Sequence, residues 1–142
     1  MVQLWRVGER ASGGNRLEVH VLSPLRNATR LRALAFDHSN TTLAVGGDDG
    51  RVQIWSMVNG SQRILTEGHD APLTALAFSL DGGWIASGAQ DGSIYRQPIA
   101  GGGPTRVFVG HTSAITSLAF LPSSHQVASA SSDGTVRIWN GE

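Results

Sequence analysis

Short apolar runs separated by turn residues recur along this chain with a fixed step. Three six-residue runs, at 31–36, 73–78 and 115–120, each end in Leu-Ala-Phe. An Asp-Gly pair, a strong signal for a tight hairpin, follows each run. Because Asp49, Asp91 and Asp133 are each 42 residues apart, the pattern predicts three in-phase units of short antiparallel strands.

The turn signals divide the first two units into four expected strands each and the third unit into three. They lie at 31–36, 42–45, 52–56 and 63–65 in the first unit, at 73–78, 84–87, 93–97 and 106–109 in the second, and at 115–120, 127–130 and 135–139 in the third. Residues 2–7 match the third strand of a unit. Residues 17–22 alternate apolar and polar side chains, as a half-exposed strand does. The chain is therefore expected to begin and end at a third strand.

The third unit carries the most complete set of motif residues. Gly110-His111, Leu118-Ala119-Phe120, the Ser129 to Gly134 segment and Ile138-Trp139 together resemble the WD40 repeat. A period of about 40–45 residues with four strands is typical of such propeller blades. The resemblance implies an all-β fold of four-stranded antiparallel blades, a partial propeller of about three blades. The whole chain, 1–142, is then one WD40-repeat region, with a partial unit at 1–25 and repeats at about 26–67, 68–109 and 110–142.

Three blades and a fraction are too few for a ring, because closed propellers have typically 4–8 blades. An open arc leaves strand edges unpaired, and unpaired edges favour association. Two interpretations remain open. Either the chain resembles the C-terminal portion of a larger propeller whose other blades lie on another polypeptide, or copies of the chain assemble into one ring.

Composition narrows the function classes. Hydrophobic residues make up 40% and charged residues 15% of the chain, which is typical of a folded protein. The formal net charge is zero, so nothing global indicates a nucleic-acid or membrane partner. There is no cysteine, no apolar run of the ~20 residues that a membrane helix needs, and no signal-peptide pattern at the N-terminus. We expect a cytoplasmic protein.

The resemblance implies a structural hydrogen-bonding tetrad in the third unit, formed by His111, Ser129, Asp133 and Trp139. The other units hold partial tetrads, namely His69, Ser87 and Asp91 in the second and Asp49 and Trp55 in the first. A Ser, a His and an Asp also make up a hydrolase triad. Because this Ser lies inside a strand and the Trp occupies its oxygen, we expect a structural role.

No cofactor, metal or catalytic constellation is expected. The five histidines show no ligand spacing, and zinc needs three or four converging ligands. The inner strands offer Arg32, Thr74, Thr116 and Ser117 but no acid–base pair, so an enzyme with a site at the ring centre is only an alternative.

Binding is the function that the resemblance implies: a non-catalytic scaffold for protein partners. In this family the partner usually lies on the face that carries the Asp-Gly hairpins. The positions that map there are Arg30, Arg32, Asp48, Pro72, Thr74, Gln90, Ala114, Thr116 and Ser132. Arg26, Arg30 and Arg32 also form a cluster. Since Arg suits bidentate phosphate recognition, binding of a phosphorylated peptide or nucleic acid is a second alternative.

Overall fold

The chain folds into short antiparallel strands, with no helix among the described residues. The computed structural model describes residues 2–9, 15–22, 30–65, 68–122 and 124–141, with side chains from residue 30 onward. The strands are β1 (Val2–Glu9), β2 (Asn15–Leu22), β3 (Leu31–Phe36), β4 (Thr42–Gly47), β5 (Val52–Ser56), β6 (Gln62–Ile64), β7 (Leu73–Phe78), β8 (Trp84–Ala89), β9 (Ile94–Pro98), β10 (Arg106–Phe108), β11 (Ile115–Phe120), β12 (Val127–Ser131) and β13 (Val136–Trp139).

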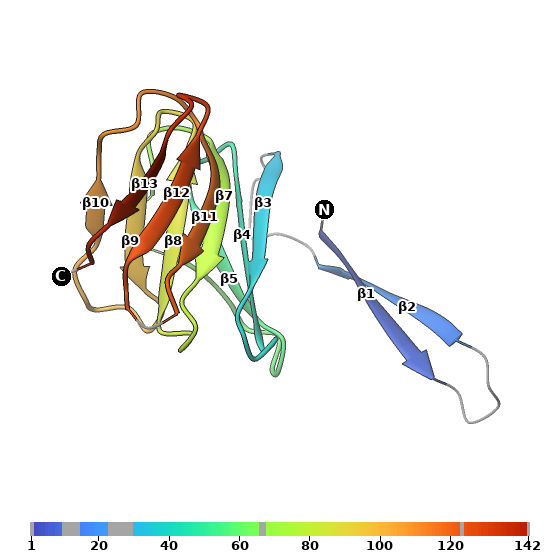
Figure 1. Cartoon of the computed structure of the whole chain (residues 1–142). Coiled ribbons are helices and arrows are strands. Elements are labelled where there is room, and N and C mark those ends of the chain that lie inside the picture. The colour runs from blue at the N-terminus through green and yellow to red at the C-terminus, as the bar shows by residue number, and fades with distance from the viewer. Residues whose placement is uncertain (1, 10–14, 23–29, 66–67, 123, 142) are drawn as a thin grey trace.

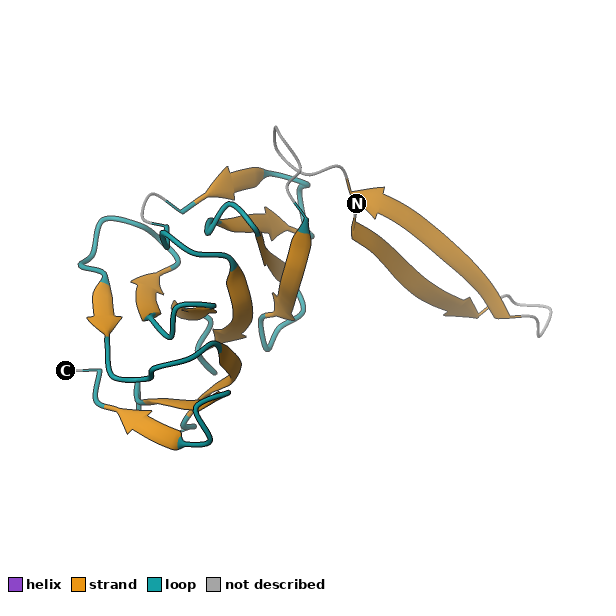
Figure 2. Ribbon diagram, turned by 90° about the horizontal axis from the view of Figure 1, so that it is seen from above, coloured by secondary structure: helices purple, strands orange, loops and turns teal. Residues whose placement is uncertain are grey.

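Strands β3 to β13 form three blades that stand face to face around a common centre (Figures 1 and 2). Blade 1 has the order β3-β4-β5-β6 and blade 2 has β7-β8-β9-β10, whereas the described residues of blade 3 form only β11-β12-β13. The prediction of an all-β fold of antiparallel blades in a partial propeller is therefore confirmed. Where bounds differ from the sequence-based strands, they shift by one or two residues. Ser93, for example, belongs to the turn before β9 because its backbone N–H bonds to the Asp91 carboxylate at 3.0 Å.

The hairpin after each second strand turns at the Asp-Gly pair. Asp133 Oδ1 accepts the Thr135 backbone N–H at 2.9 Å, which closes the turn of blade 3. Gly92 and Gly134 follow their aspartates with φ of 87° and 83°, a region that glycine adopts without steric cost. The dipeptides thus mark one end of the blades, shown at the top of Figure 1 by the link between β12 and β13.

Each inner strand carries a β-bulge at the same repeat position. The register with the neighbouring strand shifts between Leu31 and Ala33 in β3, and at the equivalent positions of β7 and β11. The extra residues are Arg32, Thr74 and Thr116. A bulge re-aims the side chain it carries and increases the local twist.

The core lies between blades. Val52, Ile54 and Leu65 of blade 1 pack with Leu73 and Ile85 of blade 2. Blade 2 contributes Ala75, Ala86 and Ile94 to a second cluster, in which Ile115 and Val127 of blade 3 complete the packing. Each blade therefore stabilises its neighbour, because burying one large apolar side chain contributes ~1.5–3 kcal/mol.

The two outermost blade faces are open. On blade 3, Val136 is 73% exposed and Ile138 is 62% exposed. Their counterparts in blade 1, Val52 and Ile54, are buried. Leu34 on the opposite face of blade 1 is 61% exposed. The apolar surface that would contact further blades is therefore present but uncovered.

The N-terminal segment forms a separate hairpin. β1 and β2 pair antiparallel from Val2–Leu22 to Glu9–Asn15, and Figure 1 shows them beside the three blades. Antiparallel pairing of 2–9 with 15–22 is what a third and fourth blade strand would show. None of the described residues forms a helix able to cross a membrane.

Candidate functional site

Four side chains of blade 3 form a continuous hydrogen-bonded chain. His111 Nδ1 lies 2.7 Å from Asp133 Oδ2, and His111 Nε2 lies 2.8 Å from Ser129 Oγ. The Trp139 indole N–H donates to the same Ser129 oxygen at 2.8 Å. Because a carboxylate only accepts, the bonds place the imidazole proton on Nδ1, and the Ser129 hydroxyl donates to Nε2.

The carboxylate of this chain is held ionised. The Thr135 hydroxyl donates to Asp133 at 2.7 Å, His111 donates from the other side, and the backbone N–H groups of Thr135 and Thr112 add two more bonds. These donors, Thr135 first, hold the pKa of Asp133 well below its usual range. The anion in turn orients the His111 ring.

The order Asp133, His111, Ser129 has the connectivity of a hydrolase triad, but its oxygen is closed off. Ser129 is 2% exposed within β12, and the Trp139 N–H already occupies its hydroxyl oxygen. A nucleophile must face a substrate carbonyl next to an oxyanion hole. Here the fixed polar network instead joins β12 and β13 to the loop that precedes β11.

Blade 2 builds the network differently from the expectation. His69 Nε2 contacts Ser87 Oγ at 2.8 Å, as in blade 3, but His69 Nδ1 contacts the Ser93 hydroxyl at 2.8 Å rather than Asp91. That hydroxyl donates to Asp91 Oδ1 at 2.7 Å and so stands between the two residues. Burial disfavours the imidazolium and lowers the pKa of His69 to about 4. The centre of the His69 ring also lies 4.0 Å from the centre of the Tyr95 ring, with the two planes tilted by 30°.

Blade 1 keeps the tryptophan without the hydroxyl. Trp55 is 2% exposed, and no described residue accepts its indole N–H, since Val45 stands where blade 3 has Ser129. Asp49 remains in its turn, where it accepts the Arg51 backbone N–H at 3.2 Å. Asn27, at the histidine position, lies outside the described residues. The tetrad is thus complete in blade 3 and incomplete in blade 1.

The nine candidate binding residues lie at one end of the blades. One backbone hydrogen bond per blade joins six of them in pairs: Asp48 N to Arg30 O at 3.0 Å, Gln90 N to Pro72 O at 2.9 Å, and Ser132 N to Ala114 O at 2.9 Å. We call this the Asp-Gly surface; it comprises Arg30, Arg32, Asp48, Pro72, Thr74, Gln90, Ala114, Thr116 and Ser132.

The bulges supply the central residues of the Asp-Gly surface. Arg32, Thr74 and Thr116 are the extra residues of the three inner strands, and all are at least partly exposed. Arg32 also forms an ion pair with Asp48, whose side chain is 35% exposed. Of the expected Arg cluster, Arg30 and Arg32 are exposed, whereas Arg26 lies outside the described residues.

A buried arginine was missed by the sequence analysis. Arg96 is 5% exposed, its guanidinium lies 4.3 Å from the centre of the Trp84 ring, and Nη1 donates to the His125 carbonyl at 3.0 Å. The 42-residue step places Ile54 and Ile138 at the same repeat position. Comparing the units position by position would have singled out this charge.

Among the described residues, no group of three or more potential ligands could hold a metal ion.

Comparisons with known proteins agree with these repeats. The family described as "WD domain, G-beta repeat" matches residues 18–56, 60–95 and 102–140, which is most of the chain. "Structure of U3-55K" superimposes with a TM-score of 0.79 at 24% identity, and "Crystal structure of RRP9 WD40 repeats" with 0.79 at 22%. They cover 94% and 97% of this chain, which spans 41% of each of those chains.

Two curated proteins share shorter stretches. "Ribosome biogenesis protein erb1" of Botryotinia fuckeliana (strain B05.10) is 54% identical over 33 residues, which are 23% of this chain and 4% of that protein. "Periodic tryptophan protein 2 homolog" of Dictyostelium discoideum is 30% identical over 59 residues, 42% of this chain and 6% of that protein. The chain therefore spans only a small part of these relatives.

Proposed function

The chain belongs to the WD40-repeat family, and we propose that it is a non-catalytic scaffold that binds a protein partner through the Asp-Gly surface. The bulge in each inner strand supports this proposal most directly. It places one partly exposed side chain per blade, Arg32, Thr74 and Thr116, at the same end of three rigid sheets. Side chains on a rigid frame bind with little loss of conformational entropy.

The hydrogen-bonded network behind that surface fits a supporting role. In blade 3 it ties the loop before β11 to the Asp133 turn, so the two loops that carry Ala114 and Ser132 keep a fixed spacing. We assign His111, Ser129, Asp133 and Trp139 to stability and positioning rather than to chemistry. The same assignment holds for His69, Ser87 and Asp91 in blade 2.

A capture experiment tests the proposed surface. Proteins retained by the wild-type chain are identified by mass spectrometry and compared with those retained by the triple variant Arg32→Ala/Thr74→Ala/Thr116→Ala. A matched control carries three exposed changes elsewhere, His38→Ala, Asn59→Ala and Arg106→Ala. Loss of one partner from the surface variant alone supports the proposal. Equal retention by all three chains would overturn it.

We propose further blades as a second class of partner. Val136 and Ile138 on one end face, and Leu34 on the other, are exposed apolar positions of the kind that blade neighbours bury within the chain. Either a complementary chain supplies those blades or copies of this chain do. Light scattering on the purified chain separates the two: a discrete oligomer indicates copies, and a monomer excludes them.

Binding of a phosphorylated peptide or nucleic acid is the weaker proposal. The Arg32 guanidinium is already paired with Asp48, which reduces its availability to phosphate. Phosphate contacts would make affinity fall steeply with salt. Salt-insensitive binding, or unchanged binding by Arg30→Ala/Arg32→Ala, would remove this alternative.

We propose a single region with repeats at about 26–67, 68–109 and 110–142 after a partial unit at 1–25, working in the cytoplasm. One relative is named a ribosome biogenesis protein, and this name favours the alternative that the chain acts where ribosomes are assembled. Microscopy of the tagged protein distinguishes a cytoplasmic from a nuclear location.

A further inference from the structure

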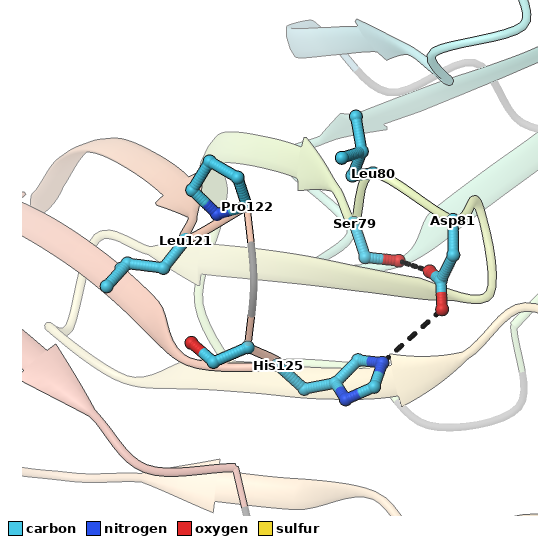
Figure 3. A pocket seen from close by; sticks show the side chains of 7 residues that line it. Ser79, Leu80, Asp81, Leu121, Pro122 and His125 are labelled. Atoms are coloured by element: carbon cyan, nitrogen blue, oxygen red, sulfur yellow. Dashed lines mark hydrogen bonds and ion pairs between the residues drawn. The ribbon is translucent and has the colours of Figure 1, made fainter.

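A pocket opens between blades 2 and 3, at the end of the blades opposite the Asp-Gly surface. Its volume is about 450 Å³, and it lies between the loop after β7 and the loop after β11. Leu80, Leu121 and Pro122 line it with apolar atoms, and Asp81 and His125 line it with polar ones (Figure 3). Leu80 is 54% exposed, so its apolar side chain is accessible to a partner at this pocket.

The acidic side chain of this pocket does not close its own loop, because a serine makes that hydrogen bond instead. In blade 1, Asp37 is 8% exposed and accepts the Thr42 backbone N–H at 2.8 Å, which closes the loop between β3 and β4. In blade 2 the equivalent bond, from Trp84 N at 2.9 Å, goes to the Ser79 hydroxyl. The carboxylate of that loop, on Asp81, is therefore not needed to accept this N–H, and its side chain is 59% exposed.

Asp81 is held ionised, and its carboxylate faces His125 of blade 3. The Ser79 hydroxyl donates to its Oδ1 at 2.5 Å and the Gly83 N–H at 3.0 Å, while Oδ2 faces His125 at 3.3 Å. These donors, Ser79 first, lower the pKa of Asp81 to about 2. Its side chain is 59% exposed, so Oδ2 is accessible from solvent as well as from His125.

The other wall of the pocket, the loop that carries His125, is held in place by blade 2. Arg96 donates to the carbonyl of His125 at 3.0 Å, and its guanidinium stacks on Trp84, so the loop that carries His125 is anchored to blade 2. Both walls of the pocket are thus set by hydrogen bonds before any partner arrives. A pre-formed site loses less entropy on binding than a mobile one.

We propose that this pocket docks a protein segment that carries a leucine-like side chain next to an arginine. The apolar side chain lies between Leu80 and Pro122, and the guanidinium replaces His125 as the donor to Asp81 Oδ2. Arg is favoured over a neutral donor because the carboxylate presents a full charge in a fixed position. The inference rests on the proposed scaffold function but assigns a second site, on the face away from the Asp-Gly surface.

The test uses the whole chain and a synthetic probe. The peptide acetyl-Gly-Leu-Arg-Gly-amide is titrated into isotope-labelled protein to about 1 mM, where weak binding is still detected by NMR. Control peptides carry Glu in place of Arg or Ser in place of Leu. We expect the amides of Leu80, Gly82 and His125 to shift with the first peptide and to shift much less with either control.

Two variants test the named contacts. Asp81→Asn keeps the shape of the side chain without its charge and should weaken binding about two- to fivefold, the range for a half-exposed ion pair. Leu80→Ser should weaken binding at least as much. The control Asp70→Asn removes one exposed charge at the opposite end of β7 and should change nothing.

The outcomes separate this pocket from the scaffold proposal. Absence of shifts at the pocket, equal shifts with the Glu peptide, or unchanged affinity of Asp81→Asn would each overturn the pocket. Shifts confined to Thr74 and Thr116 would also overturn it, while leaving the Asp-Gly surface supported. Dispersed amide spectra of each variant show that the loss is not caused by unfolding.

Discussion

Removing the Ser129 hydroxyl should destabilise the chain more than any exposed serine substitution. The variant Ser129→Ala leaves two groups without a partner, the Trp139 indole N–H and His111 Nε2, each now 2.8 Å from the serine oxygen. A buried polar group without a hydrogen bond costs ~1–3 kcal/mol. His111 is buried and Trp139 is half-buried, so we expect a total loss of about 2–4 kcal/mol. For a domain of this size, that lowers Tm by about 10 °C.

Urea unfolding followed by tryptophan fluorescence measures this loss. Ser132→Ala is the matched control, because Ser132 is exposed in the same hairpin and its hydroxyl makes no hydrogen bond to a described residue. Surface substitutions of that kind stay within about 0.5 kcal/mol. Trp139→Phe, alone and combined with Ser129→Ala, completes a double-mutant cycle, with an expected coupling of about 1 kcal/mol. A loss for Ser129→Ala no larger than for Ser132→Ala would refute the network's role in stability.

Three further predictions concern the histidines and the turn glycines. Because the pKa of His69 is about 4 in the folded chain against 6.5 when unfolded, the unfolded state binds the extra proton. Stability should therefore fall as pH drops from about 6.5 towards 4, by about 2 kcal/mol at pH 5. Urea melts at pH 6.5 and pH 5 check this pH dependence, and His69→Gln should show less of it. Gly92→Ala should cost at least twice the roughly 1–2 kcal/mol of Gly134→Ala. Both have positive φ, but only the Gly92 Cβ would approach a backbone oxygen, His111 O, at 2.7 Å; equal urea midpoints would contradict this. His111→Ala should lower Tm more than Asn27→Ala, and equal thermal melts would argue against a stabilising tetrad.

The repeat period made the fold predictable from the sequence. Three Asp-Gly turns and three Leu-Ala-Phe runs at one spacing define the blades, because strand length and turn position depend on local residues. The contacts between blades were harder to predict from the sequence. Arg96 packs on Trp84, which belongs to another strand of blade 2, and bonds to a loop of blade 3, so its environment depends on tertiary contacts.

The candidate sites show the same division. The bonds within blade 3 follow from residue types at known repeat positions. The insertion of Ser93 between His69 and Asp91 does not, because a hydroxyl two residues after the aspartate becomes a bridge only when the turn presents it to the ring. The Asp81 carboxylate likewise faces the pocket because Ser79, and not an aspartate, accepts the Trp84 N–H. The sequence pattern does not show this contact.

The most direct test of a scaffold that binds at the Asp-Gly surface is hydrogen exchange of the chain, alone and with the partner obtained by capture. We predict that partner binding slows amide exchange in the residues around Arg32, Thr74 and Thr116 in all three blades. Unchanged exchange there, with protection only on the outer strands β6 and β10, would contradict the proposed function.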